Sequence, residues 1–179
     1  MKYLRRLIWF AANRLLALAV VLTMMTIAFY FSMNAANIYV ILKDGMAERA
    51  QTVMIEETPG RLEKYFAKSY IDRDNVLTST RTGTNPYARY SITGFDHRLS
   101  MEWMWCWPWD TTARAEFTET IPRIDGRVKS SSADAARALY SDGFEYPPKW
   151  QGGRYAATLV KENGQWHVRS LTLLAQVDE

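Results

Sequence analysis

The longest apolar stretch of the chain begins near its N-terminus. No charged residue occurs between Leu15 and Leu42. The part up to Met33 already has the length that a helix needs to cross a hydrocarbon core, about 20 residues. As one helix the whole stretch would measure about 42 Å, which exceeds a core of about 30 Å. We therefore predict a transmembrane helix that emerges as an interfacial stalk around Asn34 and Asn37.

The distribution of charge predicts how this helix is oriented. Four basic residues and no acidic residue precede the stretch, namely Lys2, Arg5, Arg6 and Arg14. Positive residues are retained in the cytoplasm, so we expect a single-pass cell-membrane protein with a cytoplasmic N-terminus. The predicted parts are a basic cytoplasmic tail (1–14), a transmembrane helix and stalk (15–42) and an extracytoplasmic domain (43–179). A cleaved signal peptide and a buried core helix are the competing interpretations, and the length of the uncharged stretch argues against both.

After Lys43 the spacing of apolar residues first becomes helical. Residues 45–57 have the period of a helix, and Thr58-Pro59 has the N-cap and first-turn residues of a second one. We expect this second helix to end around Asp72 to Asn75, and the polar residues 78–86 to form a loop.

The period then changes to two, which is typical of strands. We expect a bend at Asp96-His97, a turn at Asp125-Gly126 and a tight hairpin at Asn163-Gly164. A short helix at 133–140 and a loop at 143–153 interrupt the pattern. The predicted strands are 87–95, 98–109, 111–121, 126–130, 155–160 and 165–177. The fold class is α+β, with two or three helices packed on a curved, mainly antiparallel sheet of four to six strands.

Two segments of the chain resemble a known superfamily. The helix TPGRLEKYFAKSYIDRDNVL and the closing RYAATLVKENGQWHVRSLTLL, with its Asn163-Gly164 turn and Trp166, resemble the nuclear-transport-factor-2-like domains, also known as the SnoaL and ketosteroid-isomerase-like cone. The resemblance covers about residues 45–179 and implies that a bent sheet wraps the helices into a cone. That fold hosts isomerases, dehydratases, ligand binders and non-catalytic assembly modules, so it does not define the activity. A membrane helix followed by such a cone is similar in architecture to assembly proteins of type IV secretion and conjugation machines.

The aromatic content, 13% with seven Trp, is concentrated in one predicted strand. Alternate residues of a strand share a face, so the odd-numbered positions form an aromatic ladder. Its members are Leu99, Met101, Trp103, Trp105, Trp107 and Trp109. The ladder is interpreted either as core beneath the helices or as a binding surface. Pro108 cannot donate a backbone hydrogen bond, so Trp107 and Trp109 are the two that we expect to be exposed to a partner or a lipid surface.

Charge and cysteine content exclude several functions. The formal net charge is +3, and the four N-terminal basic residues leave −1 for the remainder. A nearly neutral domain gives no electrostatic reason to expect nucleic-acid binding. Cys106 is the only cysteine, so neither an intrachain disulfide nor a cysteine zinc site is expected, and it is interpreted as a buried apolar group. With two histidines and no acidic cluster, we expect no metal and no cofactor.

Few residues are candidates for acid–base chemistry. The enzymes of the resembled fold use an Asp–His pair with a Tyr, which would fall on Asp96 or Asp110, His97 and Tyr90. No spacing requires this arrangement, and His97 between Asp96 and Arg98 is expected to lie in a solvated turn. The sequence therefore predicts no catalytic residue.

Two functions remain. The first is a non-enzymatic assembly module of a bacterial envelope complex, which binds another envelope protein or a second copy of itself. The alternative is a cone that binds a small apolar ligand, or acts on it as an isomerase or dehydratase, within the aromatic ladder. A cone interior filled by its own side chains would favour the first, and an empty interior the second.

Overall fold

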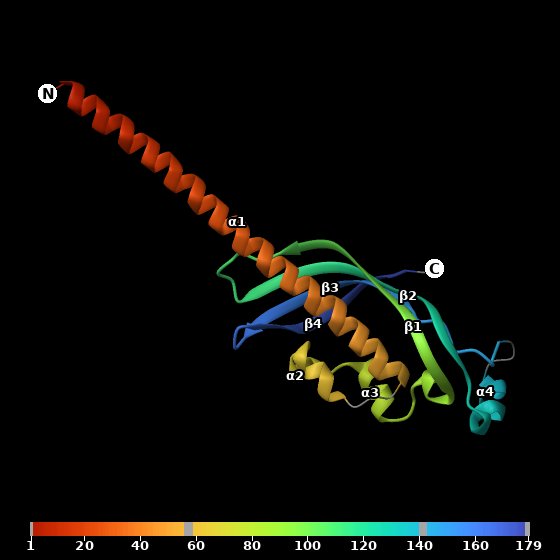
Figure 1. The fold of residues 1–179 in the computed structure, drawn as a ribbon. Helices are drawn as coiled ribbons and strands as arrows, with labels where there is room; N and C mark the ends of the chain where they lie inside the picture. Colours follow the sequence, from red (N-terminus) through yellow and green to blue (C-terminus); the bar gives the residue numbers. More distant parts are fainter. Residues whose placement is uncertain (1, 56–58, 140–142, 178–179) are drawn as a thin grey trace.

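A single long helix dominates the molecule. The computed structural model describes residues 2–55, 59–139 and 143–177. Its helix α1 (Lys2–Ile55) runs without interruption from the apolar stretch into the folded domain (Figure 1). Among the described residues it is the one helix long and apolar enough to cross a membrane, and its most apolar stretch is not buried.

The position at which α1 becomes buried differs from the expected boundary. Most large apolar side chains before Asn34 are exposed and Ile27 and Phe31 are half-buried, but Asn34 is only 4% exposed and Ile38 and Leu42 are fully buried. Ile38 and Leu42, predicted to lie in the membrane helix and stalk, therefore belong to the domain core. A membrane-spanning helix and a domain core both select apolar residues, so composition alone does not mark the position at which the core begins.

The described residues form one antiparallel sheet of four strands in the order β1-β2-β3-β4. The strands are β1 (Tyr90–Trp105), β2 (Thr112–Val128), β3 (Gly152–Glu162) and β4 (Gln165–Val177). The two long strands bend along the C-terminal half of α1 (Figure 1). The general α+β architecture is thus confirmed, with the lowest of the expected strand numbers.

Two expected interruptions of the sheet are wrong. Asp96 pairs with Arg123 inside β1, so the predicted bend is a register irregularity within a continuous strand. Asp125 and Gly126 pair with Gly94 and Ile92, so they do not form a turn. Pairing along two long strands satisfies the backbone at these positions and overrides the local turn preference.

The hairpin between β3 and β4 has the expected turn. Asn163 and Gly164 have φ angles of 51° and 82°, the left-handed conformation that a tight hairpin requires. The prediction from the Asn-Gly pair is therefore confirmed.

Short helices cover the other side of α1 and the ends of the sheet. The predicted second helix is divided, and Asp74, expected at its end, instead caps α3 by accepting from the backbone N–H groups of Val76 and Leu77. Residues 78–81 are therefore helical rather than loop. The proposed cap Thr58 lies outside the described residues, whereas the short helix expected at 133–140 is present to Leu139. These elements are η1 (Pro59–Lys64), α2 (Lys68–Ile71), α3 (Asn75–Arg81), η2 (Pro86–Arg89), η3 (Ser130–Ser132) and α4 (Ala133–Leu139).

The core lies between the sheet and the short helices, with α1 passing through it. The α1 side chains that it contains recur at three and four residues, as on one face of a helix. They are Ile38, Leu42, Met46, Ala50, Val53 and Met54, each at most 2% exposed. They pack with residues from the sheet and from the segment after α1, including Phe66, Phe117, Leu159 and Val168.

Candidate functional site

A buried ion pair joins α1 to the start of α3. The Arg49 Nε donates to Asp74 Oδ2 at 2.7 Å, and its second guanidinium nitrogen lies 3.3 Å from Oδ1. The Tyr70 hydroxyl donates to the same carboxylate at 2.6 Å. The two charged side chains are 8% and 4% exposed, so this is a fully enclosed, bidentate pair.

The pKa values of this cluster follow from its enclosure. Burial opposes ionisation of Asp74, but the charge of Arg49 and hydrogen bonds from Arg49 and Tyr70 outweigh it and hold the pKa below its usual value. Burial raises the pKa of Tyr70, so its hydroxyl stays protonated and serves as a donor. Burial also disfavours the charge of Arg49, yet the charge and hydrogen bond of Asp74 raise its pKa, so the guanidinium keeps its charge.

A second buried pair lies on the sheet. The His97 Nε2 is 3.1 Å from Glu119 Oε1, and their side chains are 6% and 0% exposed. The expectation of a solvated turn at His97 is therefore wrong: the strand continues through this position and directs the imidazole inward. Within the described part of the structure, Glu119 Oε2 and His167 Nδ1 are buried without a hydrogen-bond partner. Burial and the Glu119 carboxylate raise the pKa of nearby Tyr155.

The other acid–base candidates occupy different places. Asp96 is exposed and pairs with Arg98 at 2.6 Å. Asp110 lies in the turn after β1, where its carboxylate accepts from the backbone N–H of Trp107 at 3.1 Å. Tyr90 is buried at the opposite end of β1. Among the described residues no group of three His, Cys, Asp or Glu is arranged to hold a metal ion.

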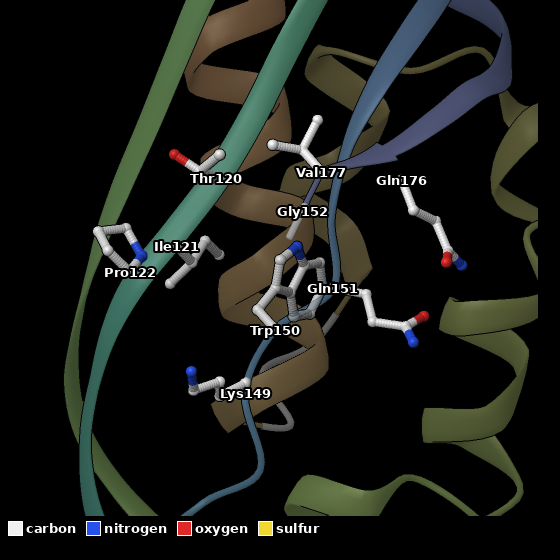
Figure 2. Close-up of a pocket in the computed structure, with 9 residues that line it drawn as sticks. All are labelled: Thr120, Ile121, Pro122, Lys149, Trp150, Gln151, Gly152, Gln176 and Val177. Carbon is white, nitrogen blue, oxygen red and sulfur yellow. The ribbon is translucent and has the colours of Figure 1, made fainter. Parts of the chain in front are cut away.

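Two cavities lie beside the segment that precedes β3. One of about 440 Å³ is lined by Arg49, Tyr87, Trp150 and Tyr155, among others. The other, of about 470 Å³, lies between β2, this segment and the end of β4, with the Trp150 indole near its centre (Figure 2). Within the described residues the Trp150 Nε1–H is buried and unpartnered. Both cavities share the lining residues Lys149, Trp150, Gln151, Gly152 and Gln176.

The tryptophans of the aromatic ladder are exposed rather than core. Trp103 and Trp105 are each 48% exposed, Trp107 41% and Trp109 68%. Leu99 and Met101 do pack against the core, as the ladder predicts. Between Met101 and Trp103, β1 gains one residue relative to β2, and this bulge reverses which face each later side chain occupies.

The exposed tryptophans surround the turn between β1 and β2. We call Trp105, Trp107 and Trp109 the tryptophan ledge. The rings of Trp107 and Trp109 are stacked 5.3 Å apart, and Trp105 meets Trp107 edge-on at 5.3 Å. Cys106 between them is 2% exposed, as expected of a small apolar group, and burial raises the pKa of its thiol.

The ledge touches α1 where the helix enters the domain. The Phe31 ring lies edge-on to Trp105 with 6.3 Å between centroids. Three residues further on, the Asn34 side-chain amide donates to the Pro108 carbonyl at 3.4 Å. Figure 1 shows the β1–β2 turn beside α1 at this level.

A groove on the outer face of the sheet begins at the ledge. It encloses about 650 Å³ and is open to solvent along β1 and β2. We call it the tryptophan groove; its lining residues are Trp103, Trp105, Asp110, Thr112, Ala113, Arg114 and Thr158.

Sequence reasoning did not identify Arg49, Asp74 or Glu119. A signal was present in the pattern, because Arg49 falls within the apolar stripe of α1 and Glu119 occupies one of the alternate, buried positions of β2. A charged residue at a core position of a regular pattern is a marker of a buried polar pair.

The chain has no match among models of protein families, curated proteins or solved structures.

Proposed function

We propose that this chain is a membrane-anchored, non-enzymatic interaction module of a bacterial envelope complex. Its α1 crosses the membrane with the basic N-terminus in the cytoplasm, and a nuclear-transport-factor-2-like domain projects outside. The domain binds another membrane or envelope protein, or a second copy of itself. Nucleic acid is not part of this proposal.

The observation that supports the proposal is the path of α1. The side of the sheet on which a ligand-binding cone would keep its pocket is packed with side chains from one face of α1 that are at most 1% exposed, namely Ile38, Leu42, Met46, Ala50 and Val53. The helix that anchors the protein thus also forms its core. Such a domain is held at a fixed height above the bilayer, which suits a component that must meet neighbours in one plane.

The tryptophan groove is the surface that we assign to the protein partner. Trp and Arg are the residues most enriched where binding energy concentrates in protein interfaces. Trp103 and Arg114 bring both types together on an open face. The Trp103 indole is half exposed on the isolated chain, and covering it removes apolar surface from water.

Site-specific photo-crosslinking in native membranes tests this assignment. A photoreactive phenylalanine analogue at Trp103 should give a discrete higher-mass adduct, and Arg114→Glu should reduce its yield. The matched control is the same probe at Tyr146, an aromatic residue that is 56% exposed and does not line the groove. Recovery of the monomer alone from the Trp103 variant would contradict the proposal.

One observation favours the alternative, a ligand-binding or catalytic cone. One carboxylate oxygen of Glu119 is buried without a hydrogen-bond partner in the described structure. Tyr155, whose pKa the Glu119 charge raises, lines the 440 Å³ cavity. A small molecule in that cavity should co-purify with the protein and be seen by native mass spectrometry. Gly152→Leu adds side-chain volume beside both cavities and should then abolish the binding of this small molecule. Finding only the apo mass removes this alternative.

A further inference from the structure

The tryptophan ledge has a position that neither the groove nor the buried pairs explain. We propose that it is a second membrane contact, which lies in the headgroup layer of the leaflet that α1 leaves on entering the domain. This inference rests on the membrane-spanning role of α1 in the proposed function. Its occupant is the lipid bilayer itself, not a protein.

The level of the ledge along α1 is set by two contacts. Trp105 meets Phe31, and Pro108 accepts from Asn34. Arg14 is the last charged residue before the apolar stretch and marks the opposite boundary of the hydrocarbon core. At 1.5 Å per residue, Phe31 lies about 26 Å and Asn34 about 30 Å from Arg14 along the helix. A core of about 30 Å therefore ends where the ledge begins.

Burial along α1 changes at the same level. Asn34 is the first α1 residue that the domain buries, and Met33 before it is still 45% exposed. The lipid-facing part of the helix thus ends at the residue that contacts the ledge. The ledge lies directly beside the end of the proposed span. Lipid that surrounds the helix at this level therefore also contacts the ledge.

The ledge has the chemistry of the interfacial layer. Trp is enriched at membrane–water interfaces because its ring is apolar while its N–H still needs a polar partner. The stacked Trp107 and Trp109 present such rings with 41% and 68% exposure, and Pro108 between them restricts the backbone of the turn. Charged groups of both signs lie among the described residues of the groove and around Cys106, namely Asp110, Arg114 and Lys161, so attraction to an anionic lipid is not required.

Depth-dependent fluorescence quenching tests the inference on the full chain. The protein, with Cys106→Ala to remove the native thiol, is reconstituted in phosphatidylcholine vesicles. An environment-sensitive dye is placed on Trp109→Cys, and vesicles carry a nitroxide either at the headgroup or deep in the acyl chain. Two further labelled variants are the references: Val21→Cys within the span and Tyr146→Cys, which is exposed and lies beside Ser91 and Gly126, at the opposite end of β1 from the ledge.

The expected result is a blue-shifted emission at position 109 that the headgroup nitroxide quenches more strongly than the deep one. Position 21 should show the opposite preference, and position 146 should not be quenched. If the label at position 109 behaved like the label at position 146 while the label at position 21 was still quenched, the ledge contact would be overturned but the span would stand. Loss of quenching at 21 would overturn the span and the proposed function as well.

A protein occupant gives a different signature. If a second copy covered the ledge, the blue shift at 109 would persist without lipid quenching and would fall as the protein is diluted in lipid. That outcome also overturns the inference.

A second experiment avoids the dye and the introduced cysteines, in case the labelled variants misfold. Headgroup-brominated lipid quenches part of the intrinsic tryptophan emission, and the double variant Trp107→Phe/Trp109→Phe should lower the quenched fraction. An unchanged quenched fraction contradicts the proposal.

Discussion

Arg49 and Asp74 connect two parts of the chain that are far apart in sequence. Desolvating two charges is costly, and a buried pair is tolerated only when its geometry and extra hydrogen bonds compensate. Here the carboxylate accepts from Arg49, Tyr70 and the backbone of α3 at once. One residue therefore caps α3, neutralises the charge on α1 and fixes the distance between the two helices.

Removing the carboxylate should be far more costly than removing an exposed one. We expect Asp74→Ala to lower the free energy of unfolding by about 3–5 kcal/mol, because it leaves the Arg49 charge buried and uncompensated. The matched control is Asp96→Ala, whose partner Arg98 is 65% exposed, with an expected cost of about 0–1 kcal/mol. Urea unfolding in detergent micelles measures both. Equal costs for the two substitutions would contradict the role given to the buried pair.

The same pair makes stability depend on pH in a defined direction. The pKa of Asp74 is lower in the folded protein than in the unfolded chain, where it is about 3.9. Its contribution is therefore complete above that unfolded value and is lost as the pH falls through the lower folded pKa. The stability difference between the native protein and Asp74→Asn should shrink over this range and stay constant above pH 6. A difference that does not change on acidification would show that Asp74 is not ionised in the fold.

The elements that sequence predicts well are those whose signals are local. The Asn163-Gly164 hairpin, the short helix α4 and the order of helices before strands depend on neighbouring residues, and each is present. Asp125-Gly126 carries an equally strong turn signal but lies inside β2. Its conformation is decided by a partner strand about 30 residues away, which a reading of local pattern does not include.

The face that a side chain occupies is also decided by the partner strand. Strict alternation places Met101 and Trp103 on one face, but the extra residue in β1 separates them, so Trp103 and Trp105 turn outward. His97 and Glu119 meet for the same kind of reason, because the register between β1 and β2 brings two inward positions together. The exposed turn with Trp107 and Trp109 could be predicted, since Pro108 provides a local reason for it.

Close packing of α1 on the segment that follows it depends on one glycine. A Cβ built at Gly45 would lie 2.9 Å from the Cβ of Tyr65 and 3.3 Å from the Phe66 ring. The Tyr65 Cβ is bonded directly to the backbone and the Phe66 ring is buried in the core, so both atoms have little freedom to move. The absence of a side chain is thus what lets the helix approach this closely.

Gly45→Ala should therefore destabilise the protein although alanine favours helices. We expect a loss of about 1–3 kcal/mol in the free energy of unfolding, typical of overpacking in a core. Gly94→Ala is the control, because nothing lies within 4 Å of a Cβ at that position of β1. Circular dichroism during urea unfolding compares the two. A Gly45→Ala protein as stable as the Gly94→Ala protein would contradict the close approach.

At the scale of the whole molecule, α1 is one element in two environments. Its first part presents apolar side chains on all sides, and from Asn34 onward one face is buried by the sheet and the short helices. A helix that is apolar all round is typical of lipid or of a core. In the proposed function α1 passes from one to the other without a linker, so a continuous helix couples the domain to the membrane and fixes the levels of the tryptophan ledge and groove.

A nitroxide scan along α1 in lipid vesicles tests this account most directly. Spin labels at single-cysteine positions from Leu18 to Met54 are read for contact with oxygen, which partitions into lipid, and with a water-soluble nickel complex. We expect lipid contact at every position up to about Met33, then a helical period from Ile38 onward in which buried positions exclude both reagents. Access of the nickel complex to Val21 and Met25, or lipid contact on all sides through Leu42 and Met46, would contradict it.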